Sequence, residues 1–243
     1  MGTPLSTKAR LYRFTALDAL AVAVYLGFTA YFTFAGEAVE RLMLQLFPEP
    51  ATASYAVNAL FYAGVGIFAV ASAWRVAGRD LKILATRPWF TLGMIPLAIV
   101  VMLILTAVLV AAFGTAQSSE NQLGIQGLLQ QVPAWLMVPL LVLLGPFVEE
   151  YLVRHLLIGK LSQYVNIWIC CVISVVVFAS IHVVGREGLV LSALAPYLGM
   201  AVVLVAVYVW TGKNLMFSYF VHAAKNLMAV VLIYAIPPEM LPN

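Results

Sequence analysis

The stretch PFVEEYLVRHLL, residues 146–157, places the adjacent carboxylates Glu149 and Glu150 inside an otherwise apolar run. Arg154 and His155 follow in the same run. An ionisable residue inside a transmembrane helix costs several kcal/mol, so it is rare there and usually functional. If this run spans a membrane, its charges predict a polar site within the bilayer.

The composition indicates that lipid is the solvent for most of the chain. Of the 243 residues, 64% are hydrophobic and only 9% are charged, whereas a soluble domain carries about 25% charged residues. The net charge of +3 is too small to indicate a nucleic-acid partner. The adjacent cysteines Cys170 and Cys171 are expected to be small buried residues, because neighbours on a helix rarely bridge.

Hydropathy predicts an all-α, polytopic membrane protein with about seven transmembrane helices. A helix needs about 20 apolar residues to cross the hydrocarbon layer. Segments of this kind lie at about 15–35, 53–75, 89–113, 134–158, 165–184, 189–211 and 214–236. Turn-forming residues separate several of them, as in FPEP at 47–50, GTAQSSENQ at 114–122, TGKN at 211–214 and IPPEMLPN at 236–243. We expect one membrane domain over residues 1–243, with the spans in 15–113 of unknown role.

Lysine and arginine predict the orientation, since they are enriched in cytoplasmic loops. Ten of these residues fall on one side of the predicted helices and two on the other; the ten are Lys8, Arg10, Arg13, Arg75, Arg79, Lys82, Arg87, Arg154, Lys160 and Lys213, and the two are Arg41 and Arg186. This bias predicts a multi-pass protein of the cell (inner) membrane, with a cytoplasmic N-terminus and a C-terminus outside. Asp18 is expected to be an interfacial residue beside Arg13.

The other ionisable residues of the spans cluster in residues 134–236, which we expect to be the catalytic core. Glu150 and Arg154 are four apart and predict an ion pair on one helical face, which leaves Glu149 unexplained. In FASIH, Phe178 and His182 share a face of the next span. Glu149 and His182 each lie about 16 residues, or about 24 Å, from the turn between the two helices. An antiparallel hairpin therefore brings them to the same depth.

The last predicted span holds HAAKN, in which His222 and Asn226 are four apart and share a face. Lys225 points elsewhere and can snorkel or line a polar cavity. A carboxylate and an imidazole beside a water molecule form a general-base arrangement, and a second histidine and an amide offer donors to an oxyanion. Glu149, His182, His222 and Asn226 therefore predict hydrolysis of an acyl bond.

These three segments resemble the motifs of a known family. EEYLVR, FASIH and HAAKN match, in order, the patterns EExxxR, FxxxH and HxxxN of the CAAX-prenyl protease and bacteriocin-processing (CPBP, Abi) intramembrane proteases. The likeness covers about residues 140–230 and implies an intramembrane endopeptidase that acts on a membrane-associated protein or peptide. Each motif alone is weak evidence, but three in order, each in its own span, are specific.

The resemblance also implies roles for individual residues. Glu149 would activate the attacking water together with His182, while His222 and Asn226 would stabilise the oxyanion. Glu150 and Arg154 would orient the catalytic helix, beside Phe178 of the second motif. The family's first motif usually continues Phe-Arg-Gly, whereas here Val153 and His155 flank Arg154. A histidine in the place of that glycine predicts a looser helix neighbour or a polar contact.

Alternatives to a cofactor-free endopeptidase remain at this point. The sequence has no HExxH zinc signature, and we expect no cofactor, but two histidines and a glutamate are also a zinc ligand set. A proton-coupled transporter would use Glu149 and His182 as a relay, although transporters usually carry broken helices and inverted repeats in both halves. A catalytically silent family member that acts in binding or immunity is the third alternative. The substrate could be a C-terminal tail, a leader peptide or a prenylated protein.

Overall fold

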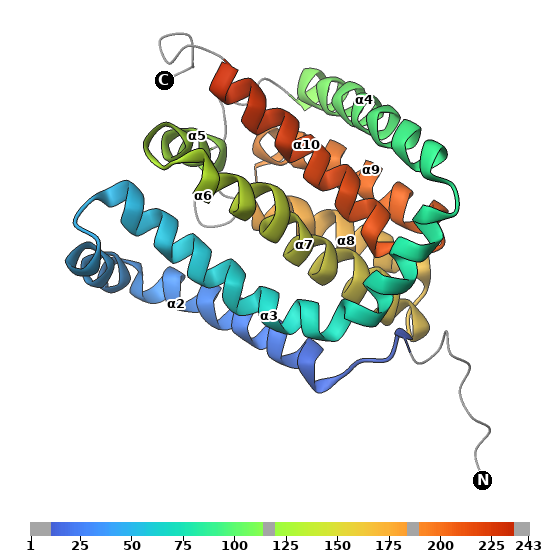
Figure 1. The fold of residues 1–243 in the computed structure, drawn as a ribbon, viewed down its shortest axis with the longest axis horizontal. Coiled ribbons are helices and arrows are strands. Elements are labelled where there is room, and N and C mark those ends of the chain that lie inside the picture. The colour runs from blue at the N-terminus through green and yellow to red at the C-terminus, as the bar shows by residue number, and fades with distance from the viewer. Residues whose placement is uncertain (1–10, 114–119, 184–189, 236–243) are drawn as a thin grey trace.

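The computed structural model describes residues 11–113, 120–183 and 190–235, which are helical apart from short turns and caps (Figure 1). The elements in chain order are α2 (Ala16–Leu46), α3 (Pro50–Ala85), α4 (Pro88–Phe113), α5 (Glu120–Gln131), α6 (Ala134–Val138), the π-helical segment η1 (Pro139–Leu144), α7 (Gly145–Glu149), the π-helical segment η2 (Glu150–Lys160), the 3₁₀ turn Leu161–Gln163, α8 (Ile167–Ile181), α9 (Leu191–Trp210) and α10 (Leu215–Ala235).

Six helices of the described residues are long and apolar enough to cross a membrane, so the protein is a multi-pass membrane protein. One of them is the continuous helix Ala134–Gln163, which runs from α6 to the 3₁₀ turn and is called the central helix below. Each of the seven predicted segments contains a helix, but the fifth holds only α8, Ile167–Ile181. Its 15 residues extend about 22 Å, less than the hydrocarbon thickness of about 30 Å.

Three predicted boundaries were wrong because hydropathy detects the edge of the lipid rather than the end of a helix. α2 continues beyond residue 35 to Leu46 through a kink at Ala35, where the backbone is not helical. α3 continues through most of the predicted 76–88 loop, to Ala85. In the predicted turn 114–122, residues 114–119 lie outside the described part of the chain, while Glu120–Gln131 form the polar helix α5. The predicted turn at 236–243 also lies outside it.

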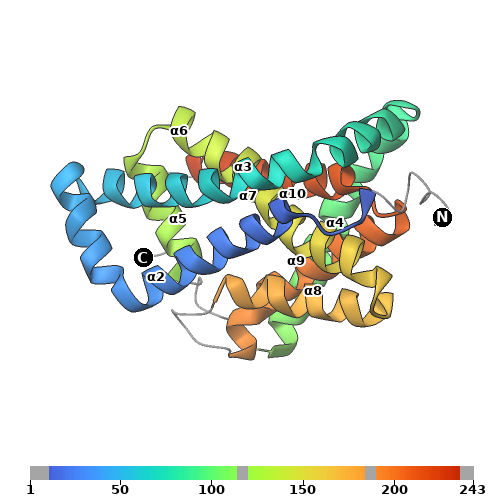
Figure 2. The same cartoon turned by 90° about the horizontal axis from the view of Figure 1, so that it is seen from below.

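The central helix lies in the middle of the bundle (Figures 1 and 2). α2 and α3 pack side by side as a helical hairpin, and α4 packs against α9 on the other side of the molecule. Between these pairs, α7 contacts both α3 and α10, while η2 contacts α8. The segment that carries Glu149 and Glu150 therefore touches helices from both halves of the chain.

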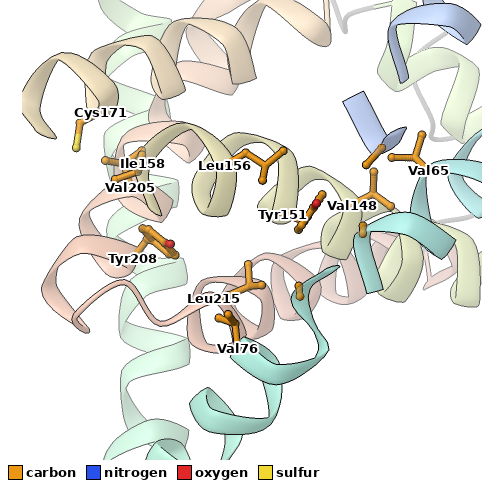
Figure 3. Packing of buried hydrophobic residues seen from close by; sticks show 13 residues of the cluster. Val65, Val76, Val148, Tyr151, Leu156, Ile158, Cys171, Val205, Tyr208 and Leu215 are labelled. Carbon is orange, nitrogen blue, oxygen red and sulfur yellow. The ribbon is translucent and has the colours of Figure 1, made fainter. Parts of the chain in front are cut away.

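A buried apolar cluster fixes this position of the central helix (Figure 3). Its members come from six helices and include Val65 and Val76 of α3, Val148, Tyr151, Leu156 and Ile158 of the central helix, Cys171 of α8, Val205 and Tyr208 of α9, and Leu215 of α10. Both cysteines are free and buried, which confirms their prediction as small core residues.

A buried ion pair joins α2 to the central helix, and the prediction that Asp18 is an interfacial residue was wrong. Asp18 is 1% exposed, and Lys160 Nζ donates to its Oδ1 and Oδ2 at 2.7 and 2.6 Å. Tyr151 and Ser72 each donate a hydroxyl hydrogen to Oδ1 at 2.5 Å. The partners lie 54 to 142 residues away in sequence, so tertiary packing alone brings them to Asp18.

Burial of Lys160 and Arg154 changes the count of lysine and arginine residues that predicts the orientation. Lys160 is 2% and Arg154 0% exposed, so neither belongs to a loop and neither should count toward the loop bias. Without them the bias is eight residues against two. Its sign is unchanged, and the cytoplasmic N-terminus stays a prediction.

Candidate active site

Two histidines from two different helices approach the same carboxylate oxygen of Glu149, on a third helix. Glu149 is the last residue of α7, His182 caps the C-terminus of α8, and His222 lies within α10. The Nε2 atoms of His182 and His222 each lie 3.7 Å from Glu149 Oε2. Glu149 and His182 were predicted to lie at the same depth because they are equally far from the turn between their helices, and the two side chains are in contact.

Hydrogen bonds at Nδ1 set the tautomer of both histidines. His182 Nδ1 lies 2.7 Å from the backbone oxygen of Phe178, and His222 Nδ1 lies 3.0 Å from Glu150 Oε1. Both partners are acceptors, so each Nδ1 carries the hydrogen that it donates. In the neutral form, each Nε2 then turns a lone pair toward the same oxygen of Glu149.

Glu150 is the buried anchor that holds α10 against the central helix. It is 0% exposed and accepts hydrogen bonds from Ser218 Oγ and His222 Nδ1. Arg154 NH1 lies 3.2 Å from its Oε1, as the spacing of four predicts. The structure thus connects Glu150 to His222 directly, in addition to its pairing with Arg154.

Phe178 contacts both the buried cation and the two imidazoles. The guanidinium carbon of Arg154 lies 4.2 Å from the centre of the Phe178 ring, within cation–π range. The same ring lies 4.7 Å from the His182 ring and 5.8 Å from the His222 ring, between centroids. Phe178 therefore packs against both histidines and limits how far their rings can rotate.

Asn226 satisfies a backbone group of the central helix. Its Nδ2 donates to the oxygen of Leu141 at 3.0 Å. In the π-helical register of η1, Gly145 N–H bonds to the oxygen of Leu140, so the next donor, residue 146, would bond to Leu141. Residue 146 is a proline without an N–H, which leaves the Leu141 oxygen without a helical partner. The Asn226 amide supplies that donor and keeps its second N–H.

Exposure divides the site into an accessible part and a buried part. The side chains of Glu149 and His182 are 12% and 14% exposed, whereas those of His222 and Glu150 are 1% and 0% exposed. A substrate can therefore touch Glu149 and His182 directly. His222 and Glu150 are covered by the surrounding helices, and from within the bundle His222 contacts Glu149 and Glu150 contacts His222.

The structure adds site residues that the motifs do not contain. Tyr62 of α3 donates its hydroxyl hydrogen to Glu149 Oε1 at 3.0 Å, and Tyr197 of α9 stacks on His182 with centroids 4.6 Å apart. Ser218 could have been found, because it is polar and precedes His222 by four residues in an apolar run. Tyr62 and Tyr197 carry no comparable signal, since aromatic residues are common in apolar helices.

Lys225 and His155 are polar residues near the site, and in the part of the chain that the structure describes neither makes a hydrogen bond to Glu149. Lys225 is half-buried on α10. His155, which replaces the usual glycine of the first motif, is fully buried. Its ring lies 5.7 Å from the ring of Tyr12 and 5.9 Å from that of Tyr151. Within the described ranges its ring nitrogens have no hydrogen-bond partner, so aromatic rather than polar contacts accommodate it.

The sequence left a zinc ion as an alternative to general-base catalysis at this site. Among the residues that the structure describes, no group of three His, Cys, Asp or Glu side chains is arranged to hold a metal ion. Glu149, His182 and His222 nevertheless offer ligand types that zinc accepts. Chelation and elemental analysis of the purified protein would therefore distinguish a zinc site from a general base.

Comparison with known proteins supports an assignment to one family. Residues 131–228 match the family described as Type II CAAX prenyl endopeptidase Rce1-like. The membrane-embedded CAAX protease MroQ of Staphylococcus aureus is 27% identical over 160 residues, which are 63% of this chain and 60% of that protein. The membrane peptidase YdiL of Bacillus subtilis is 28% identical over 120 residues, 49% of this chain and 46% of that protein. The chain thus spans about half of these relatives, and no solved structure matches it.

Proposed function

We propose that the chain is an intramembrane endopeptidase of the Rce1-like CAAX prenyl endopeptidase family, which residues 131–228 match, with Glu149 as its general base. Its substrate is a membrane-associated protein or peptide. The observation that carries this proposal is the convergence of His182 and His222 on Glu149 Oε2, at 3.7 Å each. All three groups lie on helices inside the bundle, as hydrolysis within a membrane requires.

The attacking water is held between Glu149 and His182. Two acceptors 3.7 Å apart can both receive hydrogens from one water molecule at ordinary hydrogen-bond lengths of about 2.8 Å. His182 keeps its acceptor at Nε2 because its Nδ1 hydrogen is bound to the Phe178 oxygen. Glu149 takes one proton from the water, and the oxygen attacks the carbonyl carbon of the scissile peptide.

His222 stabilises the oxyanion that this attack creates. As an imidazolium it donates Nδ1–H to Glu150, 3.0 Å away, and Nε2–H toward the new oxyanion. The free N–H of Asn226 is a second donor. When the C–N bond breaks, Glu149 returns its proton to the leaving amine, so the base is regenerated.

Cleavage of model substrates by purified protein tests this proposal. The panel contains membrane-anchored peptides with a prenylated C-terminal tail, the same tail without the prenyl group, and a leader peptide. Glu149→Gln keeps the size and hydrogen bonding of the side chain but removes the base, so we expect normal accumulation and at least a 100-fold loss of cleavage, at the lower end of what general acid–base catalysis contributes, about 10²–10⁴. Glu40→Gln, an exposed residue of α2, is the matched control.

The outcomes also separate the two other classes of function. Full activity of Glu149→Gln would show that another group is the base. A transporter would leave every peptide intact but would move protons or solute in vesicles, with Glu149→Gln abolishing that movement. A silent family member would bind a peptide with the same affinity in parent and variant and cleave none.

A further inference from the structure

Tyr62 contacts Glu149 but lies outside residues 131–228, the segment that matches the family. It lies on α3, whose role the sequence leaves open, and its hydroxyl donates to Glu149 Oε1 at 3.0 Å. The two oxygens of Glu149 thus have different neighbours. Oε1 is held by Tyr62, and Oε2 faces His182 and His222.

Small residues allow α3 to come close enough for this contact. A Cβ atom at Gly145 of α7 would lie 3.8 Å from Cε1 and Cζ of the Tyr62 ring. One turn further along α3, a Cβ atom at Gly66 would lie 2.8 Å from Leu144 Cδ1, closer than packing permits. Glycines at a helix interface let two backbones approach. The contact of α3 with residues 144–145, called the α3–α7 seam below, therefore sets the distance between Tyr62 and Glu149.

We propose that Tyr62 is a positioning residue for the reaction proposed above, on which this inference rests. A carboxylate on a side chain with several rotatable bonds has many orientations, and only some turn an oxygen toward the histidines. The Tyr62 hydroxyl binds Oε1 and so keeps Oε2 turned to the attacking water. Through this hydrogen bond α3, one of the N-terminal spans, contributes to catalysis.

The test is Tyr62→Phe, which removes one hydroxyl group and keeps the ring that packs on Gly145. We expect kcat to fall about 10–100-fold, the value of one hydrogen bond to a charged group. KM and the unfolding midpoint are expected to stay unchanged, because the substrate contacts and the α3–α7 seam are intact. A purely structural tyrosine would instead lower the unfolding midpoint and leave the kcat of the folded fraction near the parent value.

Tyr55→Phe is the matched control. Tyr55 also lies on α3, two turns earlier, and its hydroxyl contacts the backbone oxygen of Leu136 at 3.5 Å, away from Glu149. We expect its kcat to stay within about twofold of the parent. A kcat of Tyr62→Phe within twofold of the parent, or an equal loss in Tyr55→Phe, would overturn the inference. If Glu149→Gln abolishes cleavage in the same assay, the proposed function survives that failure.

Discussion

The ion pair between Asp18 and Lys160 leads to a quantitative prediction about stability. Lys160 makes two hydrogen bonds to the Asp18 carboxylate, at 2.7 and 2.6 Å, and both side chains are 2% exposed. A hydrogen bond to a charged group contributes about 1.5–3 kcal/mol, so two contribute about 3–6 kcal/mol. Removing one partner of a buried pair costs about 3–5 kcal/mol. We therefore expect Lys160→Met to lower the free energy of unfolding by about 3–5 kcal/mol.

A double-mutant cycle separates this pair from general packing. Asp18→Asn keeps a hydrogen-bonding side chain for Tyr151 and Ser72, so the double variant Asp18→Asn/Lys160→Met has no uncompensated charge. We expect it to be no less stable than Lys160→Met alone. Unfolding is measured in mixed micelles by titration with denaturing detergent, followed by tryptophan fluorescence. Lys82→Met, an exposed lysine of α3, is the control.

Two results would refute this reasoning. One is a loss below about 1 kcal/mol for Lys160→Met, the range of an exposed ion pair. The other is a double variant whose loss equals the sum of the two single losses, since independent sites are additive and coupled partners are not. Either result would mean that the carboxylate and the ammonium are solvated rather than paired inside the bundle.

Two further predictions concern the site. Arg154→Ala is expected to lower the amount of protein in the membrane fraction, because Glu150 would be left buried without its cation at a cost of about 3–5 kcal/mol; an unchanged amount on immunoblots would contradict this. EDTA and phenanthroline are expected to leave cleavage intact. Stoichiometric zinc in purified protein, with loss of cleavage on chelation and recovery on adding Zn²⁺, would instead make Glu149, His182 and His222 metal ligands.

The amino-acid sequence by itself determined the class of the protein and the depth of its site. A chain with 9% charged residues requires lipid as solvent, whatever its tertiary structure. Helical geometry is equally local: a spacing of four pairs Glu150 with Arg154, and equal distances from one turn bring Glu149 beside His182. These inferences were possible because a helix has a fixed rise and a fixed number of residues per turn.

Only the tertiary structure decided which groups complete the site. Tyr62 and Lys160 lie 87 and 142 residues from the carboxylates that they bind, and no local periodicity relates positions so far apart. The bond from Asn226 to Leu141 depends on a backbone carbonyl that Pro146 leaves free, which residue types alone do not show. The sequence could indicate that buried polar groups need partners, but helix packing selected those partners. For Tyr62, the small residues Gly66 and Gly145 let α3 approach the central helix.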